Sequence, residues 1–396
     1  MNMNEMEPYD LNKVLLSKMD LRKVILCDCT LREGEQAAGV GFDQKTKLVI
    51  SRFLSQIGIP QIQVGYPGIS NKDKEMIKAI KNEGLNSKIE SISMIHVNNW
   101  KEHIDAALEC QVDILSLQFG VSSIRLKYVL QLSEEAALDR IYKSIIYAKE
   151  NGAYVSFTPT DATRTPLPFL RKVFQALLNA GTDRVRIADS VGILSPMGTR
   201  TLVKEVRQIV GNKPIGIHCH NDFGLALANT VSAIEAGVDF VDVTVNGLGE
   251  RTGNASLDEV VMVLKLLYGM DLHIQTEKLT ELTHLIENLT GIKVPESKPL
   301  VGRNAFAHIL DTHVMGMERF EAMYEPFHPK IVGNKRRFPL GRLSGPSAIQ
   351  KKLKELDLVF EESKIPLLVD LIKEKAENLR REIEDSEFME LVNSLK

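Results

Sequence analysis

The sequence predicts a (β/α)₈ TIM barrel of the α/β class over residues 22–271, followed by a mainly helical C-terminal subdomain over residues 272–396. Eight short apolar, β-branched runs alternate with eight longer amphipathic stretches, and this number of pairs within about 245 residues suits a closed parallel barrel. Polar clusters follow the first, seventh and eighth runs, which would be neighbouring strands in such a barrel. A doubly wound open sheet is the alternative, but no G-x-G-x-x-G turn follows the first strand.

The predicted strands begin roughly 25–40 residues apart, which leaves room for one helix in each interval. They are Lys23–Cys29, Gln61–Val64, Lys88–Met94, Asp113–Gln118, Tyr154–Thr158, Arg184–Ala188, Ile215–His218 and Phe240–Val245. The predicted helices are Lys45–Ile57, Lys72–Asn82, Trp100–Glu109, Glu134–Glu150, Leu167–Ala180, Pro196–Ile209, Ala226–Ala236 and Leu257–Leu267. Asp43 is placed to cap the first helix, and Pro196 follows Ser195 as a first-turn proline.

Both ends of the chain depart from this rhythm. Residues 1–21 form a predicted N-terminal arm. Beyond about Leu272, helices are expected at Thr276–Thr290 and Pro366–Ile383, on either side of a stretch rich in glycine and proline, Pro295–Gly345. The charged segment Lys373–Glu387 is expected to be a solvent-exposed helix.

Composition indicates an ordinary globular protein. Hydrophobic residues make up 44%, charged residues 26%, and the formal net charge is −3, so neither a nucleic-acid nor a membrane partner is expected. The four cysteines lack the paired spacing of a zinc site, and we expect them to be reduced thiols on buried strands. The N-terminal residues do not resemble a signal peptide, and no run of about 18 apolar residues occurs, so we expect a cytoplasmic protein.

The polar clusters predict a divalent metal site at the C-terminal mouth of the barrel. The spacing of His218 and His220 on a strand points both imidazoles to the same side. Two imidazoles and the Glu33 carboxylate form a common ligand set for a divalent ion, and Asn254 has an amide oxygen to offer. The alternatives are a structural H-x-H pair and a Glu33 that serves only as a helix cap or salt-bridge partner.

The motifs resemble those of the alpha-isopropylmalate synthase/homocitrate synthase family of barrel metallolyases. They are D-C-T-L-R-E-G-E-Q (28–36), V-G-Y-P (64–67), R-I-A-D-S-V-G (186–192), H-C-H-N-D-F-G (218–224), N-G-L-G-E-R-T-G-N-A (246–255), L-V-G-R-N-A-F-A-H (300–308) and Y-E-P-F (324–327). They occur in the family's order over most of residues 24–345.

The resemblance implies a Claisen condensation of acetyl-CoA with a 2-oxo acid, followed by thioester hydrolysis. Implied metal ligands are Glu33, His218, His220 and Asn254, for Zn, Mn or Mg. Implied catalytic residues are Arg32, which would polarise the keto oxygen, His313 and Tyr324 near the acetyl methyl group, and the charged Glu250 beside Arg251. Gln36 and Ser190 would bind the 2-oxo acid, and a homodimer with exchanged C-terminal subdomains is implied.

His96 and Arg164 follow strands 3 and 5, so both are expected at the rim of the barrel. Each is a candidate substrate contact, with an ordinary surface residue as the alternative. Their rim position is the reason to include them, because active sites of this fold lie at that end.

Three single positions and one short motif depart from the family pattern. Thr160 stands where the family has glutamate, Gln63 replaces the glutamate that ends strand 2, and Ser156 replaces an arginine of lysine-pathway homocitrate synthases. The usual S-G-I-H around the catalytic histidine reads Leu310-Asp311-Thr312-His313. These changes surround the substrate rather than the metal, so we expect an intact metal centre and a changed 2-oxo acid pocket.

A homocitrate synthase-like condensation is the leading functional prediction. An isopropylmalate, citramalate or other specialised 2-oxo acid synthase is the alternative. A hydroxymethylglutaryl-CoA-type lyase is disfavoured, because the loop Gly247–Asn254 lacks that group's cysteine. A non-catalytic, metal-binding relative is the remaining alternative.

Overall fold

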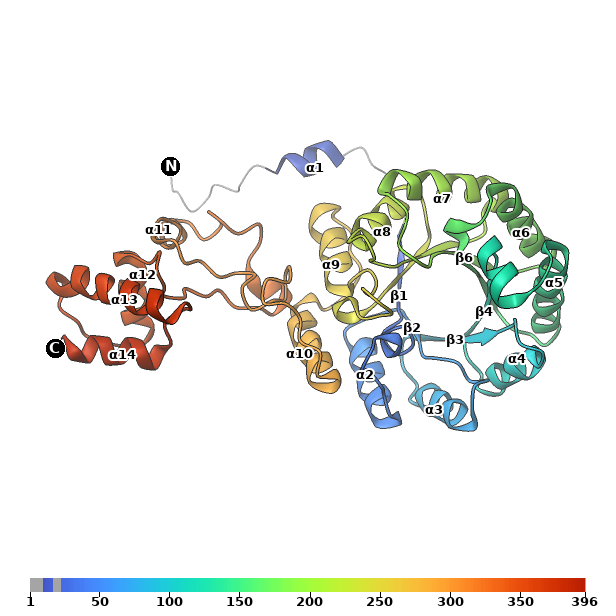
Figure 1. Cartoon of the computed structure of the whole chain (residues 1–396), viewed down its shortest axis with the longest axis horizontal. Helices are drawn as coiled ribbons and strands as arrows, with labels where there is room; N and C mark the ends of the chain where they lie inside the picture. Colours follow the sequence, from blue (N-terminus) through green and yellow to red (C-terminus); the bar gives the residue numbers. More distant parts are fainter. Residues whose placement is uncertain (1–9, 17–22, 396) are drawn as a thin grey trace. The chain divides into compact units, whose positions relative to one another are not determined.

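Eight parallel strands close into a barrel in sequence order, which confirms the predicted fold (Figure 1). The structure is a computed structural model, and it describes residues 10–16 and 23–395. The strands are β1 Ile25–Asp28, β2 Gln61–Gln63, β3 Lys88–Met94, β4 Ile114–Gly120, β5 Val155–Thr160, β6 Arg184–Asp189, β7 Ile215–Cys219 and β8 Phe240–Val243. β1 pairs with both β2 and β8, which closes the sheet without a free edge.

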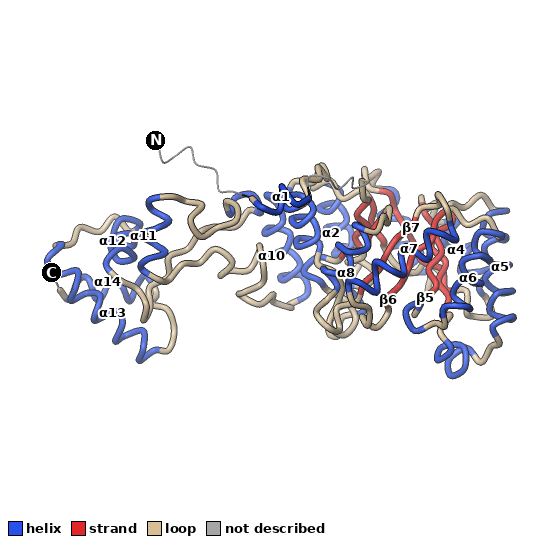
Figure 2. The backbone as a smooth tube through the Cα atoms, turned by 90° about the horizontal axis from the view of Figure 1, so that it is seen from above, coloured by secondary structure: helices blue, strands red, loops and turns tan. Residues whose placement is uncertain are grey.

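Helices surround the strands on the outside of the barrel (Figures 1 and 2). They are α2 Gln44–Gln56, α3 Asn71–Asn82, α4 Trp100–Glu109, α5 Glu134–Glu150, α6 Leu167–Asn179, α7 Pro196–Val210, α8 Ala226–Glu235 and α9 Leu257–Met262. The Asp43 side chain accepts from the Thr46 N–H, and Ser195 accepts from the Gly198 N–H, so both predicted helix starts are confirmed. The predicted last helix ends early as an α-helix, since residues 263–267 continue it as a π-helix.

The strand register brings three polar loops together. β8 lies between β7 and β1, with Ile217 opposite Val241 and Asp28 opposite Val243. The Val245 N–H donates to the Thr30 hydroxyl at 2.8 Å, which ties the loop after β8 to the loop after β1. Residues far apart in sequence therefore meet at one end of the barrel, as the order of the strands predicted.

The barrel interior holds buried charges beside its apolar side chains. Arg184 and Arg186 on β6 point to the same side of the strand and share the buried carboxylate of Glu90 on β3. The Arg184 guanidinium also lies 4.2 Å from the centre of the Phe240 ring. Gly216 on β7 makes room for this ring, because a Cβ atom at position 216 would overlap it.

The described chain divides into two compact units. The barrel unit comprises residues 12–276 and 282–293, and it includes most of α10 (Leu279–Thr290). The C-terminal unit comprises residues 10–11, 277–281 and 294–395. The predicted boundary between residues 271 and 272 falls inside the first unit.

A helical cluster with its own apolar core forms most of the C-terminal unit (Figure 2). Its helices are α11 Asp311–Arg319, α12 Pro346–Glu355, α13 Ile365–Leu379 and α14 Asp385–Ser394. Buried side chains from all four helices share this core, among them Val314, Ile349, Leu368 and Phe388. The mainly helical character of this region was predicted correctly.

Two details of the C-terminal prediction are wrong. The stretch expected to be loop contains α11, because Val314 and Met317 lie on one helix face and are buried despite Gly316 between them. The single helix expected over Lys373–Glu387 is interrupted after α13. Arg380 has a φ of 56°, and the Ile383 N–H donates to the Leu340 carbonyl, so Ile383 is buried. Burial of this apolar side chain favours the break.

Most of the predicted N-terminal arm lies outside the described residues. Within it the structure describes residues 10–16, where α1 spans Leu11–Leu16. The Asn12 side chain donates to the Leu267 carbonyl at 2.8 Å. Among the described residues, no helix combines the length and apolar character needed to span a bilayer.

The close packing of Gly216 against Phe240 gives a stability prediction. A Gly216→Ala substitution forces the Phe240 ring, and the arginine above it, out of position. Overpacking of this kind costs about 1–3 kcal/mol, so we expect a lower midpoint of thermal unfolding, measured by circular dichroism. Gly41→Ala is the matched control, since open space surrounds the Cβ position there. An unchanged midpoint in Gly216→Ala would contradict the packing argument.

Candidate metal centre

Three side chains converge at the C-terminal end of the barrel. Glu33 lies in the turn after β1, His218 in β7 and His220 directly after β7. One ligand atom of each lies within 4.8 Å of the others, and all three residues are buried. Nε2 of His218 is 3.3 Å from Nε2 of His220, and each nitrogen is 3.7 Å from a Glu33 carboxylate oxygen.

Asn254 completes the cluster from the loop after β8. Its side-chain amide nitrogen lies 3.1 Å from Nε2 of His218, and a backbone bridge joins Asn254 to His220. The amide oxygen is buried without a hydrogen-bond partner, as is Oε1 of Glu33. Two unsatisfied buried oxygens beside two imidazole nitrogens are costly in an apolar setting and fit a bound cation.

The protonation of the histidines also fits a cation. Burial, then the neighbouring His218, and then the positive charges of Arg251 and Arg32 lower the pKa of His220 to about 2. Burial lowers the pKa of His218 as well, although Asp242 opposes the shift. Both rings are therefore neutral near pH 7 and have free lone pairs, which metal ligation requires.

Asp242 on β8 orients the His218 ring. Its Oδ2 lies 2.9 Å from Nδ1 of His218, and a carboxylate only accepts, so Nδ1 carries the proton and Nε2 faces Glu33. Burial alone would raise the pKa of Asp242, but Arg186 and His218 outweigh it and keep the pKa low. Nε of Arg186 lies 3.1 Å from the second Asp242 oxygen.

Arg32 lies beside these side chains. Its Nη1 donates to Glu33 Oε2 and its Nε donates to Gln63 Oε1 at 2.6 Å, and the side chain is almost fully buried. The guanidinium is therefore a fixed positive group next to the candidate metal ligands. This position agrees with a role in stabilising a developing negative charge.

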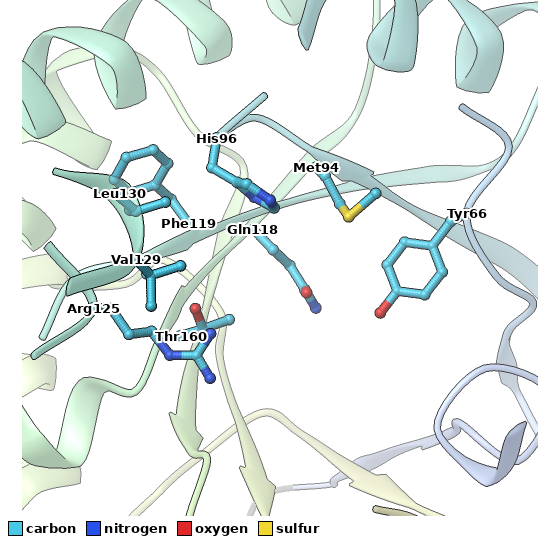
Figure 3. Close-up of a pocket in the computed structure, with 10 residues that line it drawn as sticks. Tyr66, Met94, His96, Gln118, Phe119, Arg125, Val129, Leu130 and Thr160 are labelled. Carbon is cyan, nitrogen blue, oxygen red and sulfur yellow. The ribbon is translucent and has the colours of Figure 1, made fainter. Parts of the chain in front are cut away.

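A cavity of about 130 Å³ opens at the same end of the barrel (Figure 3). Its lining is Tyr66, Met94, His96, Gln118, Phe119, Gly120, Arg125, Val129, Leu130 and Thr160. Figure 3 shows the polar ends of Tyr66, His96 and Gln118 directed into one space, with Arg125 and Thr160 at its side. Arg125 begins a π-helix, Arg125–Leu130, which follows β4.

The predicted substrate-binding residues fall into two groups. His96 lines the cavity, and Gln36 donates to the hydroxyl of Tyr66, which also lines it, at 3.3 Å. Ser190 and Arg164 instead contact Asp161. The Ser190 hydroxyl accepts from the Asp161 N–H, and Arg164 makes two bonds to the Asp161 carboxylate at 2.7 and 2.8 Å.

The other three predicted catalytic residues are Glu250, His313 and Tyr324. Glu250 is exposed and pairs with Arg251, which also binds Asp222 through two bonds. His313 and Tyr324 belong to the C-terminal unit, where their rings stack with centroids 4.0 Å apart.

A buried carboxylate organises this part of the C-terminal unit. Glu325 directly follows Tyr324 and accepts from Arg336 through two bonds, and it lies 3.1 Å from Nε2 of His308. His308 thus connects Glu325 to the neighbourhood of His313, whose ring centroid is 6.4 Å away. These contacts hold the segment that presents Tyr324.

Several residues of the site were missed from the sequence: Asp242, Glu90, Arg186, Tyr66, Gln118 and Arg125. Charged residues within otherwise apolar strands, as in R-V-R-I (184–187) and F-V-D-V (240–243), could have identified some of these residues from the sequence. Charges at such positions require buried partners. The pairing itself joins strands that are distant in sequence.

Comparison with known proteins places this geometry in a family. Residues 23–286 match the family model described as HMGL-like, and residues 300–380 match the one described as homocitrate synthase post-HMGL domain-like. The chain is 40% identical to homocitrate synthase AksA of Methanothermobacter thermautotrophicus, over 94% of each protein. It is 41% identical to 2-isopropylmalate synthase of Sulfurisphaera tokodaii, over 90% of this chain and 92% of that one.

Two further comparisons agree with this placement. The (R)-citramalate synthase CimA of Methanocaldococcus jannaschii is 41% identical over 94% of this chain and 74% of its own length. Among solved structures, an HMG-CoA lyase of Bacillus subtilis superposes with a TM-score of 0.62 at 20% identity, covering 72% of this chain and 97% of that chain, which supports the barrel fold. The chain therefore belongs to the HMGL-like family and, within it, to the group of homocitrate, 2-isopropylmalate and citramalate synthases.

Proposed function

We propose that this protein condenses acetyl-CoA with a 2-oxo acid whose far end is anionic, as a homocitrate synthase does with 2-oxoglutarate. In this reaction the acetyl methyl group loses a proton, its carbon bonds to the keto carbon, and the keto oxygen takes up a proton. Water then cleaves the thioester and releases CoA. The proposal is supported by relatives that align with 90% or more of this chain, which are homocitrate, 2-isopropylmalate and (R)-citramalate synthases.

The observation that carries the proposal is the juxtaposition of Arg32, the four candidate ligands and the adjoining cavity. Glu33, His218, His220 and Asn254 would hold a divalent cation, which supplies Lewis-acid polarisation of the keto acid when bound. Arg32, which donates to the candidate ligand Glu33, stabilises the negative charge that develops on the keto oxygen. Gln36, held by Tyr66, orients the bound acid.

The cavity supports the choice of an anionic far end. Arg125 brings a positive charge to the lining, and His96 and Gln118 add hydrogen-bonding groups. Nε of Arg125 is 3.8 Å from an Asp161 oxygen, while Arg164 holds the same carboxylate more closely, so Arg125 is the less firmly paired of the two arginines. Met94, Val129 and Leu130 form an apolar part of the lining, which favours 2-oxoisovalerate as the second candidate.

The proton from the acetyl methyl group requires a base. His313, stacked on Tyr324 in the C-terminal unit, is the proposed base. The family resemblance implies that it serves the active site of a partner subunit. A homodimer in which each C-terminal unit serves the other barrel is therefore part of the proposal.

The metal site is tested by substitution of its ligands. Glu33→Ala and His218→Ala each remove one donor from a buried set, so we expect loss of the bound ion in metal analysis and loss of CoA release. His284→Ala is the control, because this exposed histidine of the same unit pairs with Glu287 away from the site. A full complement of metal in either ligand variant would refute the assignment.

The substrate choice is tested with purified protein, acetyl-CoA and a panel of glyoxylate, pyruvate, oxaloacetate, 2-oxoisovalerate and 2-oxoglutarate. We expect the highest kcat/KM with 2-oxoglutarate. Loss of one charge-assisted contact costs about 1.5–3 kcal/mol, so Arg125→Leu should raise KM for 2-oxoglutarate about 10- to 100-fold. Arg171→Leu, an exposed arginine on α6 that pairs with Glu205, should leave it unchanged. Preference for 2-oxoisovalerate in the unsubstituted protein would favour the second candidate.

Subunit exchange is tested by complementation. Glu33→Ala lacks a metal ligand and His313→Ala lacks the base, so each variant alone should be inactive. Mixed dimers combine one intact barrel with one intact C-terminal unit, and random mixing should restore up to about a quarter of the activity. Absence of recovery in dimers shown by mass spectrometry to be mixed would place His313 and Glu33 of one chain in the same active site.

A further inference from the structure

A closed series of polar side chains lies in the barrel interior next to the candidate metal ligands. Arg32 donates to Gln63, Gln63 donates to Glu90, Glu90 accepts from Arg186, and Arg186 lies 3.1 Å from Asp242. Asp242 accepts from His218, which lies 3.7 Å from Glu33, and Glu33 accepts from Arg32. The series starts and ends at Arg32.

Gln63 has a position in this series that suits an amide. Its Oε1 accepts from Nε of Arg32 at 2.6 Å, while its Nε2 donates to Oε1 of Glu90 at 3.0 Å. A carboxylate accepts but does not donate, and glutamate at this position would place a second negative charge against Glu90. Gln63 is also one of the positions at which the chain departs from the family glutamate.

The charges of the series explain why a neutral residue is favoured at position 63. With Arg184, the series contains the guanidinium groups of Arg32, Arg184 and Arg186 and the carboxylates of Glu33, Glu90 and Asp242. Each of these carboxylates already pairs with at least one of the guanidinium groups. A carboxylate at position 63 would place a second buried negative charge directly against Glu90, which is energetically costly.

We propose that Gln63 is a positioning residue that sets the orientation of the Arg32 guanidinium toward the keto oxygen. Two ion pairs, with Arg184 and Arg186, fix the position of the Glu90 carboxylate. The Gln63 amide bonds to this fixed carboxylate and to Arg32, so it restricts the orientations that the guanidinium can adopt. This inference rests on the proposed function, in which Arg32 acts on the keto acid. Misplacement of a catalytic group by about 1 Å is enough to cost about 10²-fold in rate.

Gln61 provides a matched control on the same strand. It lies two residues earlier on the same side of β2, donates to the other oxygen of Glu90 and accepts from Arg184 at 2.8 Å. No hydrogen bond joins Gln61 to Arg32 among the described residues. Substitution of either glutamine therefore removes a bond to Glu90, but only substitution of Gln63 also removes a bond to Arg32.

The experiment compares Gln63→Met with Gln61→Met in the full-length, metal-loaded protein. We expect kcat of Gln63→Met to fall about 10- to 100-fold with KM for acetyl-CoA unchanged, and kcat of Gln61→Met to change less than about threefold. Crystal structures of both variants should show the Arg32 guanidinium displaced in Gln63→Met alone. Equal losses of kcat, or an Arg32 that stays in place in Gln63→Met, would overturn the proposal.

The crystal structures also separate this inference from the proposed function. If the unsubstituted protein released no CoA with any 2-oxo acid, the proposed function would fail, while the position of Arg32 in the variants would still decide the role of Gln63. If Gln63→Met did not fold, Gln63→Asn provides the test, because its shorter side chain withdraws the amide from Arg32 and leaves the Glu90 carboxylate and its two arginines in place. An unchanged kcat with Arg32 unmoved in Gln63→Asn would overturn the proposal.

Discussion

Glu90 is fully buried inside the barrel, and its two carboxylate oxygens accept from Arg184, Arg186, Gln61 and Gln63. Burial alone would raise the pKa of this carboxyl, but the two guanidinium groups outweigh it and hold the pKa far below the ordinary value. Glu90 therefore stays charged, and the arginines depend on it in return. Buried ion pairs of this kind stabilise little by themselves, but loss of one partner leaves the other charge uncompensated.

The same interaction connects the scaffold to the candidate chemistry. Gln63 bonds to both Glu90 and Arg32. Arg186 pairs with both Glu90 and Asp242, and Asp242 in turn accepts from His218. The positive group proposed to act on the keto oxygen and a proposed metal ligand are thus both oriented from one buried carboxylate. Such supporting contacts restrict the rotamers of the groups that do the chemistry, which is a requirement for efficient catalysis.

The residues that depart from the family pattern lie at different places in the barrel. Thr160 lines the cavity and Ser156 is buried within β5. Gln63 instead accepts from Arg32, which donates to the candidate ligand Glu33, so one departure lies next to the candidate metal centre. Relatives at about 40% identity include synthases for three different products, so identity alone does not select the 2-oxo acid. The proposed preference for an anionic far end rests instead on the charge that Arg125 brings to the cavity lining.

The sequence alone determined the barrel, the order of its strands and the identity of the metal-ligand candidates. Strand alternation and the H-x-H spacing are local properties, and closure of eight strands makes the first and last neighbours. The contacts of Glu90, Gln63 and Asp242 were decided only by the tertiary structure, since these partners lie 24 to 96 residues away along the chain and on different strands. The helix break before Ile383 was also decided only by the tertiary structure, because burial of Ile383 in the C-terminal core outweighs the local helical pattern.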